Sequence, residues 1–423
     1  MKVLIIGNGG RESAIAKKLS EDKRISQMFF AKGNATTENL GKNLPYESVA
    51  ELRDFALREK IDFTFVGPEL PLVNGIVDEF QKHNLKIFGP TKRAADLEGS
   101  KAFSKKFMQD YGIRTAKAAI FDSYVEADQY IQNHSYPLVI KASGLASGKG
   151  VVICEDKETA HHTLHQFMIE RIYGDAGIKV VIEEFLQGFE ASIIAFWNGE
   201  KAFPCVSAKD YKKVGNGNTG ANTGGMGTVA PSPEFTAEHL ADFNKNILEP
   251  TVKGIKDKAL DFVGIIFFGV LVQDNQCYLL EYNMRFGDPE TQVIMALLEN
   301  NLLDVIHDCI EGKDLDLQFS DKKAICLVMC SGGYPGNYEI GYEIQGLDKV
   351  KHSNVLFAGA EQIAGKVVTN SGRVLNVVAT GDTYEEAREK VYEDAKTLHF
   401  DYAFYREDIG KFQSNEGIFP QFF

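Results

Sequence analysis

The sequence predicts an α/β protein with three units: an N-terminal parallel-sheet domain, a larger central α+β domain and a small C-terminal α+β domain. Residues 1–100 alternate short apolar runs with segments of helical periodicity, a pattern typical of parallel βαβ units. Residues 101–323 hold many strand-like runs separated by glycine-rich turns, and residues 324–423 form a shorter strand-rich unit with a late helix. A chain of 423 residues has room for two to four such domains.

The N-terminal unit alternates strands and helices from its first residues. Apolar runs predict the strands, and apolar residues three and four apart predict the helices between them. The predicted strands are Val3–Ile6, Met28–Ala31, Phe63–Val66 and Lys86–Phe88, and the predicted helices are Glu12–Leu19, Val49–Glu59 and Val73–His83. Phosphate-bearing ligands bind at the carboxyl ends of the strands in such a parallel sheet.

The central unit starts with a predicted helix at Ser100–Tyr111, which ends at Gly112. Residues 118–190 are expected to form a flap subdomain, and the Gly-, Asn- and Thr-rich segment Val214–Met226 predicts a long loop. The predicted strands are Ala118–Phe121, Leu138–Lys141, Val151–Cys154, Val180–Glu184, Ser192–Trp197, Lys201–Val206 and a pair over residues 262–281, and further helices are predicted at Ala237–Lys258 and Thr291–Ile310.

The C-terminal unit opens with the apolar run Ala324–Cys330 and the glycine-rich loop that follows it at Ser331. Its other predicted elements are strands at Val355–Ala358, Lys366–Thr369 and Leu375–Thr380 and a helix at Tyr384–Thr397. This order predicts a small α+β domain.

Composition excludes several classes of protein. The net charge of −13, with no compensating basic stripe, argues against a nucleic-acid partner. No apolar run approaches the roughly 18 residues that span a bilayer, and the first residues enter a strand directly, so we expect no membrane segment, no signal peptide and a cytoplasmic location. The six scattered cysteines form no Cys-x-x-Cys pair and are expected to be buried thiols.

The strongest chemical signal is the strand that carries Glu281, Asn283 and Arg285. Residues two apart on a strand face the same side, so these three side chains are expected to project together. A carboxylate and an amide oxygen are hard ligands for Mg²⁺, and a guanidinium is a planar donor for phosphate oxygens. The pattern therefore predicts a site that handles ATP without a Walker loop. The alternative is an amphipathic strand with a solvated polar face.

Three loops at strand ends predict a sugar-phosphate site on the N-terminal unit. The loop from Gly7 to Glu12, with Gly9 and Gly10 at its centre, lies between a strand and a helix and is suited to cradle a single phosphate. Glu12 stands where a dinucleotide motif needs its third glycine, which argues against NAD. A tight structural turn is the alternative. The other two loops contribute Asn34 and the residues Gly67, Pro68 and Glu69.

The segment Lys141–Gly150 lies between two strands and differs from a Walker loop at both ends, because Ser143 replaces the first glycine and Gly150 follows the lysine. Such a hairpin can act as a flap over a triphosphate, with Lys141 beneath it, although a plain hairpin turn is the alternative. The flap turn itself consists of Ser147, Gly148, Lys149 and Gly150. The strand end downstream suits adenine through Glu183, Glu184, Phe185 and Leu186, and Glu190 has the spacing to reach a ribose.

A glycine-dense segment follows Asp210, and a second carboxylate, Asp288, comes shortly after Arg285. Long glycine-rich loops carry a high entropic cost and are usually functional or disordered. Function is favoured here because both carboxylates can engage an ammonium group.

Taken together, these motifs resemble the ATP-grasp superfamily, and more narrowly the phosphoribosylamine–glycine ligase family, also called glycinamide ribonucleotide synthetases. The resemblance covers essentially the whole chain. The motifs that carry it are Gly7–Glu12, Val66–Val77, Gly89–Phe103, the flap, Asn222–Gly227, Arg285–Gln292 and Ser331–Tyr338. It implies a Rossmann-like N-terminal domain at 1–100, an ATP-grasp domain at 101–323 and a small C-terminal domain at 324–423.

The resemblance also implies a reaction: ATP, glycine and 5-phosphoribosylamine give glycinamide ribonucleotide, ADP and phosphate in purine synthesis, through glycyl phosphate. Glu281 and Asn283 would hold Mg²⁺ or Mn²⁺, and Arg285 would stabilise the transferring phosphoryl group. Lys141 and Lys101 would contact the ATP phosphates, with Lys105 a further candidate. The substrate sites would use Gly9, Gly10, Asn34 and Glu69 for phosphoribosylamine and Asp210 and Asp288 for the amino group of glycine. A monomer is expected.

The chain departs from the usual pattern of this family at Ser13, where His is common, at Ser143, where Asp is usual, and at Tyr211, where His is usual. The strand Ile265–Val272 also lacks the second carboxylate that many ATP-grasp enzymes use for metal. These departures affect the finer contacts and not the reaction class.

Three alternatives stand beside the ligase. Another purine-pathway ATP-grasp ligase or carboxylase would need a bicarbonate or imidazole-ribonucleotide site. An NAD-dependent oxidoreductase would need the missing third glycine and a ribose-binding acid. A non-catalytic nucleotide-binding protein would keep the folds but lose Arg285 or Lys141, and both are present.

Overall fold

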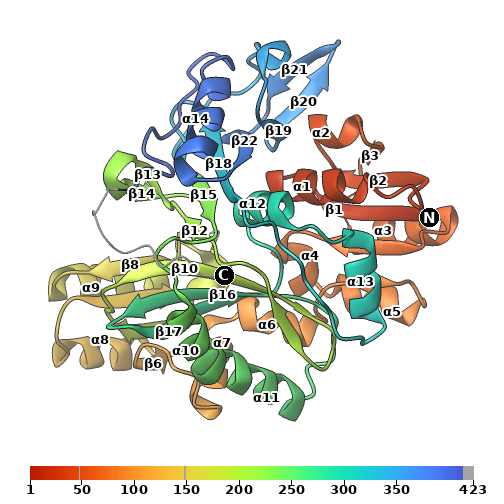
Figure 1. Ribbon diagram of the computed structural model, residues 1–423. Helices are drawn as coiled ribbons and strands as arrows, with labels where there is room; N and C mark the ends of the chain where they lie inside the picture. The colour runs from red at the N-terminus through yellow and green to blue at the C-terminus, as the bar shows by residue number, and fades with distance from the viewer. Residues whose placement is uncertain (47, 147–148, 413–423) are drawn as a thin grey trace.

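The computed structural model describes residues 1–46, 48–146 and 149–412, and Figure 1 shows how its sheets and helices are arranged. The N-terminal sheet is parallel throughout, in the order β3-β2-β1-β4-β5. Its strands are β1 (Lys2–Gly7), β2 (Gln27–Lys32), β3 (Lys42–Leu44), β4 (Phe63–Val66) and β5 (Ile87–Phe88). The parallel sheet predicted from the alternating pattern is confirmed. Gly7 lies opposite Lys32, so the loops after β1 and β2 begin at the same sheet edge.

The N-terminal helices are α1 (Gly10–Leu19), α2 (Ala35–Glu38), α3 (Val49–Glu59), α4 (Glu69–Val73) and α5 (Ile76–Lys82). The single helix predicted at Val73–His83 is wrong, because Gly75 has φ of 82° and separates α4 from α5. Only glycine adopts this left-handed conformation without strain. The short elements β3 and α2 were missed, since neither is long enough to show periodicity.

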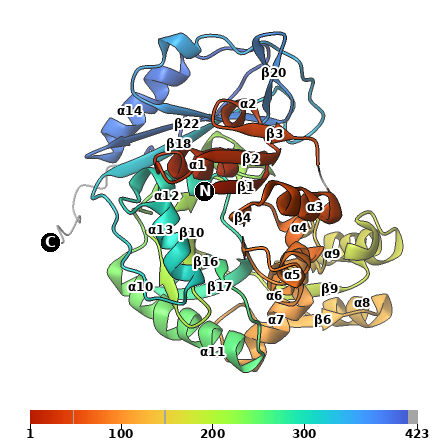
Figure 2. The same cartoon turned by 90° about the vertical axis from the view of Figure 1, so that its right-hand side faces the viewer.

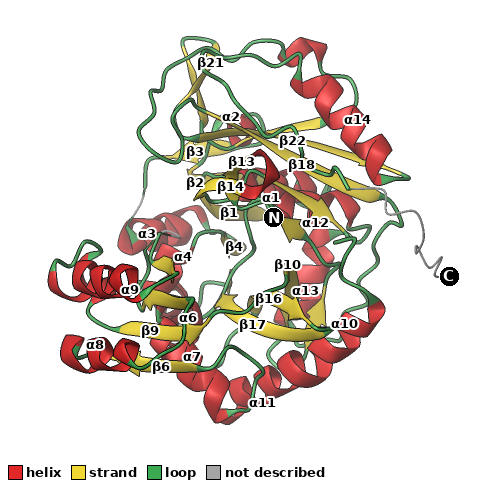
Figure 3. Ribbon diagram, turned by 90° about the vertical axis from the view of Figure 1, so that its left-hand side faces the viewer, coloured by secondary structure: helices red, strands yellow, loops and turns green. Residues whose placement is uncertain are grey.

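The flap subdomain is an antiparallel sheet in the order β6-β9-β7-β8, covered by two helices (Figure 3). Its elements are β6 (Ala118–Phe121), α8 (Tyr124–Gln132), β7 (Leu138–Ala142), β8 (Val151–Cys154), α9 (Lys157–Leu164) and β9 (Val180–Glu184). Two helices precede it, α6 (Lys92–Gly99), which was not predicted, and α7 (Lys101–Asp110). Leu138 pairs with Cys154 and Lys141 with Val151, so the predicted β7–β8 hairpin is present.

The central sheet is antiparallel, in the order β11-β10-β16-β17. Its strands are β10 (Phe189–Trp197), β11 (Ala202–Pro204), β16 (Gly264–Gln273) and β17 (Gln276–Asn283), and the helical stretch beside it consists of α10 (Ala237–Phe243), the π-helix η4 (Asn244–Leu248) and α11 (Glu249–Asp257). Apolar residues of β10, β16 and β17, among them Trp197, Phe268 and Tyr282, pack in one buried cluster with Phe107 of α7. This packing fixes β17, the strand with the strongest chemical signal, against α7.

The C-terminal sheet, β12-β15-β18-β22-β19, takes two strands from residues before 324. Its strands are β12 (Lys209–Asp210), β15 (Gly227–Ala230), β18 (Lys323–Cys330), β19 (Asn354–Phe357) and β22 (Arg373–Gly381), with helix α14 (Tyr384–Ala395) beside it and the separate hairpin β20 (Ala360–Ile363) and β21 (Lys366–Thr369). Figure 2 places this sheet above the N-terminal sheet, with α1 and α12 (Glu290–Leu297) between them.

Two sequence predictions in this region are wrong. The segment Val214–Met226 is not only a loop: β13 (Lys213–Gly215) and β14 (Thr219–Asn222) pair as an antiparallel hairpin within it. The helix predicted at Thr291–Ile310 is two helices, α12 and α13 (Leu302–Ile310), because the Asn301 side chain caps the start of α13. A side-chain cap of this kind satisfies the free N–H groups of a new helix.

No helix among the described residues is both long and apolar enough to cross a membrane. All six cysteines lie in the described part of the chain, are buried and are unpaired, as expected.

Candidate active site

Strand β17 presents its chemistry on one side. Tyr282 and Met284 are buried in the central core, whereas Glu281, Asn283 and Arg285 alternate with them and are half-buried. The Arg285 Nη2 atom lies 3.4 Å from Asn283 Oδ1. The predicted alternation of burial is therefore present, and it continues past the end of β17 at Asn283 to Arg285.

Arg285 joins two domains through carboxylates. Its Nη2 atom lies 2.9 Å from Glu98 Oε1 in α6, and its Nε atom lies 3.5 Å from Glu69 Oε2 at the start of α4. Burial opposes the charge of Arg285, but Glu98 and Glu69 raise its pKa above the ordinary value. Glu98, which also accepts the Met284 N–H at 2.7 Å, was missed, because one acid in an amphipathic helix gives no signal of its role.

Lys105 and Lys141 lie on either side of one carboxylate. Lys105 Nζ in α7 is 2.9 Å from Glu183 Oε1, and Lys141 Nζ in β7 is 2.8 Å from Glu183 Oε2. All three residues are buried. Glu183 was predicted to line an adenine slot, but its side chain is engaged by the two lysines. Of this residue, only the backbone remains available to a base.

Lys101 is the first residue of α7, and contacts of Ser100 and Ser143 hold the start of this helix in place. The Ser100 side chain caps the helix by accepting the Phe103 N–H. The Ser143 carbonyl accepts the Lys101 N–H at 2.7 Å, and Ser143 Oγ accepts the Ala102 N–H at 3.1 Å. Ser143, one of the departures from the family pattern, thus joins the flap sheet to α7. Burial lowers the pKa of Lys101, and the Glu281 carboxylate opposes that shift.

The remaining predicted nucleotide residues surround this lysine group. Ser147 and Gly148 fall outside the described residues, and Lys149 is exposed. The Glu184 carboxylate accepts the Lys117 N–H at 2.8 Å, and Phe185 and Leu186 follow it half-buried. Gly150 is buried and packs on Ala146.

Glu190, the predicted ribose contact, forms an ion pair with Lys212, with 2.7 Å between Oε2 and Nζ. The positive charge of Lys212 lowers the pKa of Glu190. Desolvation opposes the charge on Lys212, but the Glu190, Glu281 and Asp210 carboxylates outweigh it and raise the pKa of this lysine. Lys212 was not predicted, and it lies within the electrostatic reach of both predicted sites.

Asp210 in β12 has a buried carboxylate oxygen, Oδ1, that has no hydrogen-bond partner among the described residues. Burial and then the charge of Glu290 raise the pKa of Asp210 well above its ordinary value. Glu290 is itself buried and accepts a hydrogen bond from Ser192 Oγ at 3.0 Å. A buried carboxylate beside another one, with an unused oxygen, is suited to receive a cationic group.

Asp288 is already engaged by other residues. Its carboxylate accepts the Arg11 N–H at 3.3 Å and the Gln292 amide at 2.8 Å, and it lies 3.5 Å from Arg373 Nη2. Burial opposes its charge, but Arg373 and Arg11 hold its pKa below the ordinary value. Asp210 and Asp288 therefore lie in different environments, although both are within the electrostatic reach of Arg373.

Arg373 in β22 was missed, and it links the C-terminal sheet to the rest of the site. Its Nη1 atom donates to the Gly224 carbonyl at 2.5 Å and to the Asp288 carbonyl at 2.7 Å. The Tyr334 hydroxyl accepts the Gly224 N–H at 3.0 Å. These bonds hold the loop after β14 against the turn that follows Arg285. Tertiary contacts of this kind leave no local pattern in the sequence.

The loop between β1 and α1 is closed by Glu12. The Glu12 carboxylate accepts the Gly9 N–H at 2.7 Å and pairs with Arg11 Nε at 2.5 Å. A Cβ on Gly67 would lie 1.8 Å from Glu12 Oε1, and a Cβ on Gly10 would lie 2.2 Å from the amide nitrogen of Asn376. The carboxylate occupies the space that a third glycine leaves open in dinucleotide-binding loops, which agrees with the prediction against NAD. Pro68 follows Gly67 and precedes α4.

Asn34 is placed differently from the prediction. Only 3% of this residue is exposed. Its Oδ1 accepts the N–H groups of Thr36 and Thr37, and its Nδ2 donates to the carbonyls of Asn8 and Phe357. The side chain therefore joins α2, the first loop and β19, and it offers no free polar atom to a ligand.

The other two departures from the family pattern are also structural. Ser13 Oγ donates to the Phe357 carbonyl at 2.6 Å. The Tyr211 hydroxyl accepts the Gly410 N–H at 3.2 Å, and the Arg406 guanidinium lies 5.1 Å from the centre of its ring.

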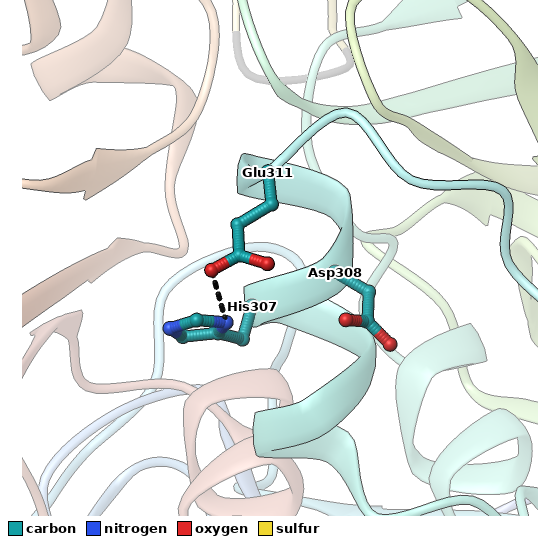
Figure 4. A group of neighbouring side chains, drawn as sticks. All are labelled: His307, Asp308 and Glu311. Atoms are coloured by element: carbon teal, nitrogen blue, oxygen red, sulfur yellow. Dashed lines mark ion pairs between the residues drawn. The ribbon is translucent and has the colours of Figure 1, made fainter.

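One group of metal-ligating side chains lies away from this site. His307, Asp308 and Glu311 of α13 come within 4.8 Å of one another, but Figure 4 shows that His307 and Glu311 face each other while Asp308 points to the other side of the helix. His161 and His165, four residues apart in the chain, pair with Asp128 and Glu170 at half-exposed positions.

A flap sheet, a central sheet and a facing set of lysines, acids and one half-buried arginine define a ligase of the ATP-grasp class. Models of phosphoribosylglycinamide synthetase match the chain in three parts: the N domain at residues 1–98, the ATP-grasp (A) domain at 99–291 and the C domain at 324–412. The chain belongs to the phosphoribosylglycinamide synthetase family.

Named relatives agree with this assignment. Phosphoribosylamine–glycine ligase of Clostridium acetobutylicum is 48% identical over 97% of this chain and 100% of its own length, and that of Escherichia coli O157:H7 is 41% identical over 97% and 98%. The crystal structure of the Thermotoga maritima enzyme has a TM-score of 0.85 at 35% identity, over 97% of this chain and 100% of that one. A biotin carboxylase from Campylobacter jejuni, at 14% identity and a TM-score of 0.72 over 95% and 92%, shares the fold alone.

Proposed function

We propose that this protein joins glycine to 5-phosphoribosylamine at the expense of ATP, giving glycinamide ribonucleotide, ADP and phosphate in purine biosynthesis. The observation that carries the proposal is the half-buried Arg285, which follows the end of β17 and forms ion pairs with Glu98 of α6 and with Glu69 at the N-terminal sheet edge. A phosphoryl group bound there would lie between a nucleotide site and a sugar-phosphate site. The family membership supplies the two substrates.

ATP is proposed to bind between the flap sheet and β17. Lys101, Lys105 and Lys141 supply positive charge for its phosphates. Positive groups fixed in advance around a triphosphate stabilise the charge that shifts during phosphoryl transfer. The backbone from Glu183 to Leu186 is available to adenine, and Glu190 to the ribose.

The residues present fit a divalent cation. Glu281 and Asn283 offer hard oxygen donors on one side of β17, and within the described ranges the Glu281 carboxylate accepts no hydrogen bond. Mg²⁺ takes a few protein oxygens together with phosphate oxygens in this way, and Mn²⁺ accepts the same ligands. When bound, such an ion neutralises phosphate charge beside Arg285.

The proposed reaction has two displacements. A carboxylate oxygen of glycine attacks the γ-phosphorus, the bond to the bridging oxygen breaks, and ADP leaves with glycyl phosphate formed. The ribosylamine nitrogen then attacks the acyl carbon, phosphate leaves, and the nitrogen loses a proton. Arg285 donates hydrogen bonds to the phosphoryl oxygens in both displacements, because the same group is first transferred and then released.

Phosphoribosylamine is proposed to bind at the edge formed by the loops of Gly9, Gly10 and Gly67. Glu69 lies beside Arg285 there, and burial opposes its charge while Arg285 and Arg11 lower its pKa, so it remains an acceptor for ribose hydroxyls. Asn34 holds the loop from beneath and does not itself bind the substrate.

Glycine is proposed to bind with its ammonium group at the free Asp210 oxygen. Asp210→Asn removes that charge without changing the shape, so we expect the KM for glycine to rise by at least about tenfold, the scale of a lost charged partner. The KM for ATP should change little. Steady-state kinetics with each substrate varied would measure this split, and an unchanged glycine KM would place the ammonium elsewhere.

The same substitution should stabilise the protein at neutral pH. The folded pKa of Asp210 lies well above the ordinary value of 3.8, so the native state holds a proton that the unfolded state releases first. Its stability therefore falls as pH rises through that window. Asp210→Asn should therefore be more stable than the unmodified protein at pH 7 and equally stable near pH 4. Thermal unfolding of both proteins between pH 4 and pH 7 would show whether the stability difference has this sign and this pH dependence.

Arg373 is expected to act on glycine through the loop that it holds. Arg373→Met removes the bonds to Gly224 and Asp288, so the glycine KM should rise about tenfold while ATP binding is retained, and Arg373→Lys should recover part of the loss. Lys366→Met, at an exposed ion pair of the β20–β21 hairpin, is the matched control. Equal losses for ATP and glycine would indicate general unfolding.

The reaction itself is tested by ADP release with ATP, Mg²⁺, glycine and phosphoribosylamine generated in situ, with each component omitted in turn. Release that needs both glycine and the ribosylamine supports the proposal. ATP consumption that needs bicarbonate and an imidazole ribonucleotide would instead indicate a carboxylase.

We further propose a cytoplasmic monomer, consistent with a net charge of −13 and with the small-molecule substrates.

A further inference from the structure

The most constrained charged group in the nucleotide region is the carboxylate of Glu183 in β9. One oxygen lies 2.9 Å from Lys105 Nζ and the other lies 2.8 Å from Lys141 Nζ. The exposed fractions of the three residues are 3% for Glu183, 3% for Lys105 and 8% for Lys141. The helix α7 and the strands β7 and β9 thus bring one charged side chain each to the same buried position.

This group is also bonded to the strand that carries the metal-binding oxygens. Lys105 Nζ donates to Thr115 Oγ1 at 2.6 Å, and Thr115 in turn donates to the Leu279 carbonyl of β17 at 2.6 Å. Lys141 Nζ lies 3.4 Å from the Leu280 carbonyl. These carbonyls come directly before Glu281, so the lysine pair and the metal-binding oxygens share one scaffold.

Two buried ammonium groups this close would repel each other without a shared carboxylate. Burial lowers the pKa of Lys105, and Lys141 lowers it further, whereas Glu183 opposes both effects. Other charged groups also lie within electrostatic reach of the pair: Glu184 acts on Lys105, and Lys141 acts on Lys101 and Glu190. Of these groups, Glu183 alone forms an ion pair with both lysines.

We propose that Glu183 is a positioning residue, which keeps Lys105 and Lys141 charged and at a fixed separation so that ATP meets both ammonium groups already in place. The inference rests on the proposed function, because it concerns the same nucleotide site. A bound triphosphate supplies the negative charge that the pair otherwise takes from Glu183 alone. The carboxylate recognises the lysines and not adenine, since both of its oxygens are engaged by them.

The test is Glu183→Gln in the full-length protein. Glutamine keeps the shape and a carbonyl acceptor but loses the charge, so one lysine should give up its proton in the free site. We expect the KM for ATP to rise by about tenfold or more and kcat to change less than about threefold. Glycine KM and the preference for ATP over GTP should stay unchanged. Glu126→Gln, an exposed acid of α8, is the matched control.

Proton uptake on nucleotide binding distinguishes this role from a purely structural one, because a purely structural role would leave it unchanged. Calorimetry of ADP binding at about pH 8.5, in buffers of different ionisation enthalpy, should show uptake of about one proton by Glu183→Gln and almost none by the unmodified protein. No added uptake with an unchanged ATP KM would overturn the proposal. A reduced preference for ATP over GTP without proton uptake would also overturn it and assign the side chain to adenine.

If Glu183→Gln does not fold, Glu183→Asp provides the same test with the charge kept. The shorter side chain reaches one lysine fully and the other poorly, so proton uptake should lie between the two values above. Uptake equal to that of the unmodified protein would count against the proposal. Binding of ADP needs neither glycine nor phosphoribosylamine, so a wrong acceptor substrate would appear only in the turnover assay.

Discussion

Replacement of Arg285 with alanine is expected to lower the rate of ADP release by at least about a thousandfold while leaving ATP binding largely intact. An arginine that stabilises a transferring phosphoryl group contributes 10³–10⁵ to kcat in other phosphoryl-transfer enzymes. Arg285 is half-buried and is held by ion pairs with Glu98 and Glu69. Single-turnover ADP formation and calorimetric ATP binding, measured on the same sample, test the two halves of this expectation.

Two further variants separate catalysis from stability. Arg285→Ala leaves the buried Glu98 without its cation, which destabilises the fold, so Arg285→Lys is needed as a variant that keeps the charge. The lysine variant should fold but remain strongly impaired, because an ammonium lacks the planar pair of donors. Arg93→Ala, at an exposed position of the same helix as Glu98, is the control. Near-normal turnover by Arg285→Ala would remove the assigned role.

The second large effect is expected from Glu281→Gln. Loss of a charged metal ligand should lower kcat at fixed Mg²⁺ by about a hundredfold and raise the Mg²⁺ concentration needed for half-maximal rate. Part of the activity should return at high Mg²⁺ or with Mn²⁺, since the amide still offers an oxygen. Lys101 and Lys212 would also lose a nearby negative charge.

Measuring the rate as a function of the Mg²⁺ or Mn²⁺ concentration distinguishes metal binding by Glu281 from a structural role. Glu238→Gln, an exposed acid in the first turn of α10, should behave as the unmodified protein. A lower kcat with no change in metal dependence would mean that Glu281 positions Lys101 and does not bind the ion.

Much of the fold follows from local patterns. The strands β4, β6, β8, β9 and β21 and the helix α3 have the bounds that periodicity predicts. These elements are short runs of apolar or strictly alternating residues, in which burial and backbone preference agree. The errors occur where a single residue ends one helix or starts another. Gly75 divides a predicted helix through its left-handed backbone, and Asn301 starts a new helix through its side chain.

In the candidate site too, some features follow from local sequence patterns and others only from tertiary contacts. Strand alternation places Glu281 and Asn283 on one side, because a period of two is a property of the strand itself, and Arg285 follows two residues after the strand ends. Asn34 and Glu183 have residue types that suit a ligand, yet the structure engages their side chains with Thr36 and Thr37 in the first case and with two lysines in the second.

The sequence by itself therefore determined the three-unit architecture, the family and the strand that carries the main chemistry, since each depends on patterns within about ten residues. Only the tertiary structure decided that β15 joins the C-terminal sheet, that Arg373 holds the Gly224 loop and that Glu98 supports Arg285. These contacts join residues far apart in the chain, and Arg373 and Gly224 are separated by 149 positions. A charge so distant leaves no periodic trace, and its partner becomes visible only when the fold brings the two together.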